Sequence, residues 1–214
     1  GPWSIMSGTL LNREYIENVW GLKINKDQNI DLSKDKDAAV GQLDVKIVNG
    51  VTSKFEERND EMFQKYAKKI WKIVMSNGDG VYLVVYPNYR MMRIISDNLQ
   101  PLLNGQVMQS NEEQVRDMKT LLDLAQANRK LVFHAVAKGR FTEGIELTDN
   151  DKSLIKHVIV AGVPLPNIGD DYIQDRISAS NYDETEWLSE HGRITTLQAI
   201  GRAIRFPDDS ATVW

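Results

Sequence analysis

Three short apolar runs, separated by longer segments with helical periodicity, constrain the fold most strongly. The runs span residues 81–86, 131–136 and 155–160, and they are rich in β-branched and aromatic residues. Continuous apolar runs of this length are typical of strands that are buried on both faces, as in parallel sheets. The intervening segments are long enough for the crossover helices that parallel strands require. The sequence therefore predicts one α/β domain with a doubly wound, mostly parallel sheet and helices on both faces.

The remaining elements are predicted from shorter patterns. Apolar residues at three- and four-residue spacing predict helices over 11–21, 63–74, 90–103 and 112–127. Further strands are expected at 43–48, 106–109 and 211–214, and a polar, charge-alternating stretch at 24–42 is expected to be an exposed connection. No internal repeat or low-complexity segment interrupts this pattern.

Composition excludes several classes of site. With 42% apolar and 26% charged residues, the chain has the composition of a soluble globular protein. The net charge of −4 means that any contact with nucleic acid must come from a local basic patch. The absence of cysteine excludes disulfides and cysteine-held zinc or iron–sulfur sites within these residues, and His134, His157 and His191 show no metal-binding spacing, so we interpret them as structural. No apolar run reaches the roughly 18 residues that span a bilayer, and the sequence shows no signal-peptide pattern.

The turn after the strand at 131–136 carries chemically informative residues. Its sequence is KGRFTEGIE at 138–146, in which two glycines lie among basic, hydroxyl and acidic residues. Such a segment fits either an ordinary turn or a backbone approach to a phosphate or ribose. The chain contains no P-loop, and no pair of carboxylates follows a strand in a position to hold Mg²⁺. We therefore expect that the chain cannot bind and hydrolyse a nucleotide by itself.

The segment 195–205 has helical periodicity with two different stripes. Thr195 is a plausible N-cap, and the helix is expected to end before Pro207. One stripe is apolar, and the other consists of Gln198, Arg202 and Arg205. Gly201 is unfavourable inside a helix, which indicates a close approach by backbone or ligand. The polar stripe fits either solvated arginines or the binding of phosphate oxygens by guanidinium groups.

Six short segments occur in a fixed order along the chain: SGTL at 7–10, SKFEER at 53–58, YPNY at 86–89, KGRFTEGIE at 138–146, GVPLP at 162–166 and QAIGRAIR at 198–205. In this order the whole chain resembles the second motor domain of XPD-type helicases, within the group that includes DinG-like helicases, and archaeal members look most similar. The resemblance implies that residues 1–22 are the end of a first motor domain and the junction, and that 23–214 are a RecA-like second motor domain. Gly1-Pro2 is typical of a cleaved tag, and we expect the sequence to be part of a longer protein.

The resemblance also implies an activity. Members of this family are superfamily 2 DNA helicases that use ATP and Mg²⁺ to move 5′ to 3′ on single strands, and many act in DNA repair. Their iron–sulfur cluster belongs to the first motor domain, so none is expected in this chain, which alone should be inactive. The implied partners are single-stranded DNA, the first motor domain and subunits of repair or transcription factors. The implied location is intracellular, in the cytoplasm of an archaeon or the nucleus of a eukaryote.

Site residues are implied by matching the family motifs position by position. The arginines that reach the γ-phosphate of ATP correspond to Arg202 and Arg205. The nucleotide-binding positions match Gln198, Gly144 and Glu146, and the family more often has Asp at the last of these. The positions along the DNA path match Lys54, Arg58, Tyr89, Arg140 and Thr142, and the family commonly has Lys and Ser at the last two.

Two other hypotheses remain open at this point. The first is a non-catalytic module of the same fold that docks DNA or a protein, but such a module has no need of a phosphate-facing stripe. A RecA-like domain of a DEAH-type RNA helicase would also carry the pattern QxxGRxxR. The segments SKFEER and GVPLP are not expected in that group.

Overall fold

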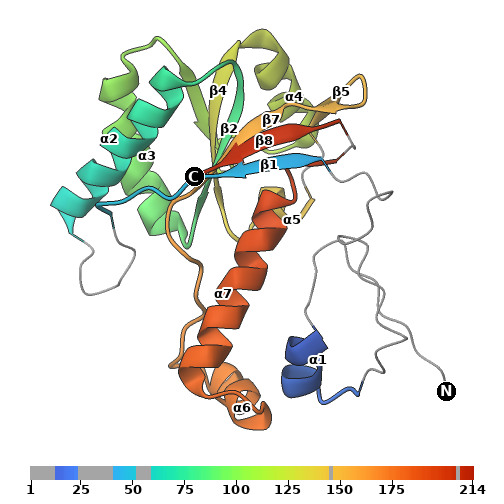
Figure 1. Ribbon diagram of the computed structural model, residues 1–214. Coiled ribbons are helices and arrows are strands. Elements are labelled where there is room, and N and C mark those ends of the chain that lie inside the picture. Colours follow the sequence, from blue (N-terminus) through green and yellow to red (C-terminus); the bar gives the residue numbers. More distant parts are fainter. Residues whose placement is uncertain (1–12, 24–40, 52–58, 145–146, 206–207) are drawn as a thin grey trace.

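The structure is a computed structural model that describes residues 13–23, 41–51, 59–144, 147–205 and 208–214. At its centre lies a six-stranded sheet in the order β1-β8-β7-β2-β4-β3 (Figure 1). All neighbouring strands in this sheet are parallel. The strands are β1 (Gln42–Val45), β2 (Gly80–Tyr86), β3 (Met108–Asn111), β4 (Lys130–Val136), β7 (Ile155–Val160) and β8 (Ser210–Val213). The predicted doubly wound α/β fold is therefore confirmed. A small antiparallel hairpin, β5 (Thr148–Asp149) and β6 (Lys152–Ser153), forms a separate pair.

The central strands separate two hydrophobic cores. Along β2, Tyr82, Val84 and Tyr86 enter one core, whereas alternate residues enter the other. Helices α2 (Asp60–Ser76) and α3 (Tyr89–Leu103) cover the first core. The second core is covered by α4 (Met118–Ala127), α5 (Arg140–Gly144) and the end of α7 (Glu184–Ile200). Since both faces of β2 are buried, its sequence is apolar without alternation, as expected for a central parallel strand.

The predicted helix over 112–127 is wrong in its first part. Asp117 is the N-cap of α4, and its side chain accepts a hydrogen bond from the Thr120 amide at 2.8 Å. The preceding residues form a turn in which Glu112 is buried, with 3% of its surface exposed. The helix therefore begins at Met118, after its N-cap, which is later than the apolar pattern indicated.

The predicted helix over 195–205 is wrong at both ends. α7 begins after Asp183, which forms a capping box with Glu186, and it ends at Ile200. Thr195 lies inside the helix, where its hydroxyl donates to the His191 carbonyl at 2.9 Å. Gly201 is the C-cap with an ordinary φ of −60°, so its conformation does not require glycine. Arg202 and Arg205 follow the helix and do not share a helical stripe with Gln198.

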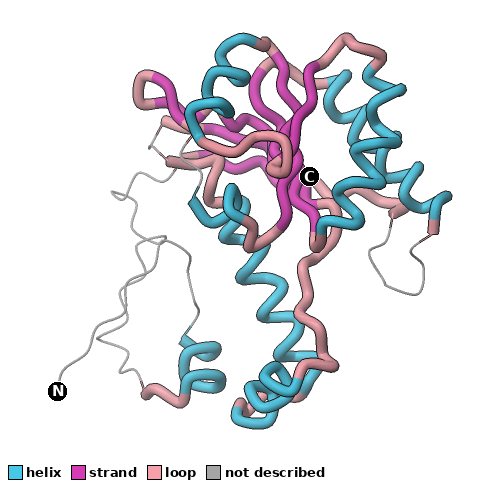
Figure 2. Tube along the Cα trace, turned by 180° about the vertical axis from the view of Figure 1, so that it is seen from behind, coloured by secondary structure: helices cyan, strands magenta, loops and turns pink. Residues whose placement is uncertain are grey.

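α7 extends away from the sheet, and α6 (Asp171–Ala179) lies at its far end (Figure 1). The tube view from behind shows the same projection (Figure 2). The short helix α1 (Arg13–Trp20) confirms the prediction of a helix ending near Gly21, and its Asn18 carbonyl accepts a hydrogen bond from the Asn181 amide at 2.9 Å. Most of the predicted connection at 24–42, and the SGTL segment, lie outside the described residues.

Two histidines are packed within the fold. His134 is 1% exposed, and its ring nitrogens lie 2.9 Å from the Tyr86 hydroxyl and 2.9 Å from Gln109 Oε1. Burial lowers the pKa of His134 to about 3. The ring of His157 stacks on Tyr82 with centroids 4.2 Å apart, and burial, followed by Lys130 and Lys46, lowers its pKa to about 4. Both rings are therefore neutral at neutral pH.

Candidate functional site

The carboxyl ends of the parallel strands meet at one edge of the sheet, where sites are common in doubly wound folds. β2 leads there into α3, with Asn88 as the N-cap, and β4 leads through Ala137–Gly139 into α5. The last turn of α7 and the residues that follow it pack on the same region, because Ala199 and Ala203 are buried in the second core. Segments that lie far apart in the sequence are thus brought together at this edge.

A cavity of about 230 Å³ opens between the β4–α5 turn and the C-terminal half of α7. Its lining consists of Lys138, Thr142, Thr195, Gln198, Ala199 and Arg202. These described residues supply two cations, an amide and two hydroxyl groups, and no carboxylate. A cavity with this chemistry suits the oxygens of a phosphate group.

Arg202 is held in this cavity by α5. Its Nε donates a hydrogen bond to the Thr142 carbonyl at 2.7 Å. Thr142 is 3% exposed, and its hydroxyl donates to the carbonyls of Val136 and Gly139 at 2.8 and 3.0 Å. The hydroxyl hydrogen of Thr142 is therefore not available to a DNA phosphate in this conformation. It stabilises the turn against which Arg202 rests.

Lys138 is a second cation in the cavity, and the sequence did not identify it as a site residue. Its backbone is left-handed with φ of +60°, and its Nζ lies 2.7 Å from His191 Nε2. The His191 ring stacks on Trp187 with centroids 4.9 Å apart. Burial, followed by Lys138 and Arg176, lowers the pKa of His191 to about 4, so the neutral ring accepts a hydrogen bond from the ammonium group. No spacing in the sequence signals this contact, because the two residues come from different elements.

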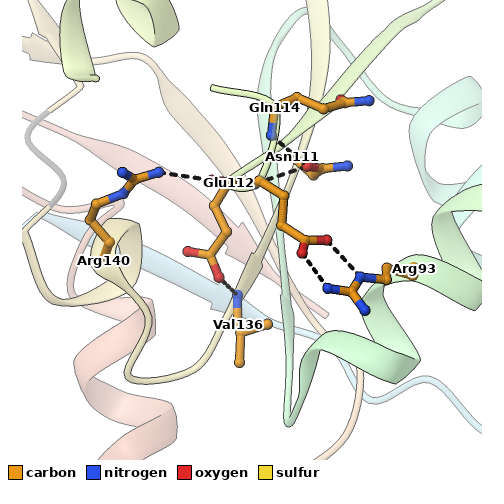
Figure 3. A network of polar contacts seen from close by, with 7 residues as sticks. Arg93, Asn111, Glu112, Gln114, Val136 and Arg140 are labelled. Atoms are coloured by element: carbon orange, nitrogen blue, oxygen red, sulfur yellow. Dashed lines mark hydrogen bonds and ion pairs between the residues drawn. The ribbon is translucent and has the colours of Figure 1, made fainter. Parts of the chain in front are cut away.

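A second group of polar contacts lies at the ends of β3 and β4 (Figure 3). The Glu112 carboxylate accepts a hydrogen bond from the Val136 amide at 3.0 Å. Nη2 of Arg140 donates to the main-chain carbonyls of Glu112 and Val115 at 2.9 and 3.0 Å. Sequence analysis placed Glu112 in a helix and missed this role.

Tyr89 lies within electrostatic reach of the same group. It is 43% exposed at the start of α3, and the guanidinium carbon of Arg93 lies 6.0 Å from its ring centroid. Burial, followed by the Glu112 carboxylate, raises the pKa of the Tyr89 hydroxyl, and Arg140 lowers it. Arg93 in turn pairs with Glu113, with Nε 2.8 Å from Oε2. The structure thus brings together Tyr89 and Arg140, two residues that the family resemblance assigns to the DNA path.

The other predicted site residues are placed less directly. Arg205 does not line the cavity, and its amide donates to Asp209 Oδ2 at 2.8 Å. Gly144 is the last residue of α5. Lys54, Arg58 and Glu146 lie outside the described residues. The roles assigned to all of these residues stay predictions.

Substituting Gly139 is expected to destabilise the turn between the cavity and Glu112. A Cβ on Gly139 would lie 2.7 Å from both Glu112 carboxylate oxygens and 2.7 Å from the Val136 carbonyl oxygen. Because a backbone atom is among them, Gly139→Ala should lower the free energy of unfolding by about 1–3 kcal/mol. Urea unfolding measures this. Gly78→Ala is the control, since a Cβ there would meet nothing within 4 Å; equal stability of the two variants would contradict the expected clash.

Metal-binding clusters and membrane-spanning helices are both absent from the described ranges. Within them, no three His, Asp or Glu side chains gather in a way that could hold a metal ion. None of the described helices is long and apolar enough to cross a membrane.

Comparisons with known proteins place these features in a family. The profile of the helicase C-terminal domain family matches residues 70–214. The ATP-dependent DNA helicase XPD of Sulfolobus acidocaldarius is 38% identical over 217 residues, which cover 98% of this chain and 38% of that protein. A solved XPD helicase superposes with a TM-score of 0.81 at 33% identity, over 98% of this chain and 37% of that one. A solved apo form of XPD gives a TM-score of 0.77 at 34% identity, over 98% of this chain and 42% of that one.

These matches agree with the fold and with the ordered motifs. The chain spans about 38% of the length of the curated relative that it matches. Its parallel sheet is the RecA-like sheet of the solved XPD structures. The chain belongs to the helicase C-terminal domain family, and over nearly its whole length it is similar to XPD-type helicases.

Proposed function

We propose that this chain is the second motor domain of an ATP-dependent DNA helicase and completes an ATP site together with a first motor domain. The cavity that contains Lys138, Gln198 and Arg202 carries this proposal, since it offers cationic and amide groups at the carboxyl edge of the sheet. The sequence has no P-loop of its own, so the triphosphate must be held mainly by another domain. The name of the 38% identical relative, an ATP-dependent DNA helicase, supports the same function.

In this site, Arg202 would stabilise the charge that develops on the γ-phosphoryl group during transfer. Its Nε is already anchored on the Thr142 carbonyl, so the guanidinium group is oriented before the nucleotide arrives. Gln198 and Arg205 would contact the same phosphate, and Gly144 and Glu146 would lie near the ribose. The described lining holds no carboxylate, which does not fit Mg²⁺; we therefore assign the metal of the Mg²⁺–ATP complex to the first domain.

A separate surface would follow the single strand. Tyr89 offers an exposed aromatic ring and Arg140 a cation, which is the combination that binds strands without regard to sequence. Lys54 and Arg58 would extend this surface. Thr142, which the family places beside the DNA backbone, would act here by holding the turn that carries Arg140.

Closure of the cleft between two motor domains would couple ATP hydrolysis to steps along DNA. We extend the proposal to 5′ to 3′ movement and to DNA repair, including nucleotide excision repair, with repair or transcription factor subunits as partners. The family resemblance supports these extensions.

The test joins this chain to an XPD-type first motor domain and measures ATP hydrolysis with and without single-stranded DNA. We expect no hydrolysis from this chain alone and DNA-stimulated hydrolysis from the joined protein. If the joined protein folds and binds single strands but shows no DNA-stimulated hydrolysis, the motor function is wrong. The chain would then act as a docking module of the same fold.

A further inference from the structure

Glu112 is a buried carboxylate that the proposed mechanism does not use. It is 3% exposed, and its Oε2 has no hydrogen-bond partner of standard geometry among the described residues, although the Tyr89 hydroxyl lies close enough for the carboxylate to raise the pKa of that hydroxyl. A buried carboxylate oxygen without a hydrogen bond lowers the stability of the fold, so other contacts of Glu112 must offset this cost. The role of Glu112 follows from what its other atoms contact.

In the hydrogen-bond ladder between β3 and β4, the carboxylate of Glu112 takes the place of its own backbone carbonyl as an acceptor. Its amide donates to the His134 carbonyl at 3.0 Å, which continues the parallel pairing of β3 with β4. In a regular parallel ladder, the Val136 amide would then donate to the Glu112 carbonyl. It donates to Glu112 Oε1 at 3.0 Å instead. The side chain thus satisfies the Val136 amide and leaves the Glu112 carbonyl to another donor.

That donor is Arg140. Its Nη2 lies 2.9 Å from the Glu112 carbonyl oxygen (Figure 3). The same nitrogen lies 3.0 Å from the Val115 carbonyl oxygen, and the guanidinium carbon lies 4.9 Å from the centroid of the Phe141 ring. Both hydrogen bonds use Nη2, and among the described residues none uses Nη1 or Nε. The two carbonyls therefore hold the guanidinium group while donors on its other nitrogens remain for a ligand.

We propose that Glu112 is the positioning residue that holds Arg140 for a phosphate of single-stranded DNA. Its carboxylate takes over the Val136 amide, and the released carbonyl binds the arginine. The role of Arg140 toward DNA rests on the proposed function, whereas the exchange of acceptors stands on the contacts above. A guanidinium group fixed before binding loses less side-chain entropy when it meets a phosphate.

The test compares Glu112→Gln, Glu112→Ala and Arg140→Ala in the 214-residue chain. Glutamine keeps a side-chain oxygen that accepts from the Val136 amide. With alanine, the Val136 amide should donate to the backbone carbonyl of residue 112 instead, and Arg140 then loses that carbonyl as a partner. Binding of a fluorescent oligothymidine is measured over a range of salt concentrations. Arg140→Ala and Glu112→Ala should each reduce the slope of log K against log salt by about 0.7, which is about fivefold in affinity at 0.1 M salt. Glu112→Gln should bind like the wild type.

Three comparisons separate positioning from a general loss of structure. The double variant Glu112→Ala/Arg140→Ala should bind no more weakly than Arg140→Ala alone, because both changes remove one contact. NMR signals of the Arg140 guanidinium should show hindered rotation at Nη2 in the wild type and in Glu112→Gln, and free rotation in Glu112→Ala. Arg129→Ala is the charge control, since its 89% exposed side chain precedes β4 at the opposite edge of the sheet.

Two results would overturn different parts of the proposal. Wild-type affinity and an unchanged Arg140 signal in Glu112→Ala would refute the positioning role. Wild-type affinity in Arg140→Ala would refute the DNA contact within the proposed function, and the NMR signals alone would then decide whether Glu112 holds Arg140.

Discussion

Replacing Arg202 by alanine is expected to lower DNA-stimulated ATP hydrolysis by two or more orders of magnitude, on the order of 10³-fold, in a protein that joins this chain to a first motor domain. Arg202 lines the cavity and is anchored through Nε to Thr142, so its loss removes a pre-oriented cation from the developing phosphate charge. Nucleotide binding should largely survive, because the triphosphate is held by the first domain. Single-turnover hydrolysis and nucleotide titration measure the two quantities separately.

A similar loss of DNA-stimulated ATP hydrolysis is expected for Arg205→Ala, although the structure itself does not carry this prediction. Arg205 does not line the cavity, and its assignment rests on the family motif. Arg193→Ala is the matched control, since Arg193 lies on α7 and pairs with Glu190 at 2.8 Å. Near wild-type turnover in both Arg202→Ala and Arg205→Ala would make this segment structural. A loss in Arg202→Ala alone would restrict the catalytic role to the residue inside the cavity.

Mild acid is expected to destabilise the fold strongly. The pKa of His134 is lowered to about 3, and those of His157 and His191 to about 4, chiefly by burial. In the unfolded chain a histidine has a pKa near 6.5, so between these values the unfolded state binds more protons. Stability is therefore complete above about pH 6.5 and falls as the pH approaches the folded values. At pH 5 the loss is about 2 kcal/mol for the fully buried His134, and it is smaller for His157 and His191, because solvent screens their charge in part. Even this loss is a large part of the stability of a typical domain.

Urea unfolding between pH 7.5 and 5 measures this loss, and NMR titration assigns it to individual rings. His134→Asn should remove the largest single share of the pH dependence, because His134 is the most buried of the three histidines, even though it also lowers stability at pH 7.5 by disturbing the contacts with Tyr86 and Gln109. Equal stability at pH 7.5 and 5 would show that the rings are not protected from protonation.

The central sheet could be predicted from the sequence because burial on both faces leaves an unbroken apolar run. The expected run at 81–86 lies within β2 (Gly80–Tyr86), and the one at 155–160 coincides with β7 (Ile155–Val160). α7 could not be predicted in the same way, since its first half projects from the sheet and carries no continuous apolar stripe. Its capping residues Asp183 and Glu186 were the available signal, and they were missed.

The candidate site could also be predicted only in part from the sequence. The motifs at 138–146 and 198–205 were expected to act together, and the structure brings Thr142 and Arg202 into contact. Lys138 and His191 were not paired in advance, because a lysine and a histidine from different elements carry no joint sequence signal. Glu112 was assigned to a helix from its local sequence. Its actual role, in which the carboxylate accepts the hydrogen bond of the Val136 amide, depends on the neighbouring strand β4. Tertiary contacts of this kind are decided by the sheet and not by local periodicity.

The projecting helix α7 can also transmit motion over its length. Its 17 residues make a rod about 25 Å long, with one end packed in the core beside the cavity and the other carrying the fully buried Trp187 near α6. A tilt of about 5° at the cavity end moves the far end by about 2 Å on this length. Under the proposed function, a small displacement of Gln198 against a phosphate would therefore be amplified at the end of α7 beside α6. The far end of the helix would then respond to a nucleotide that it does not contact.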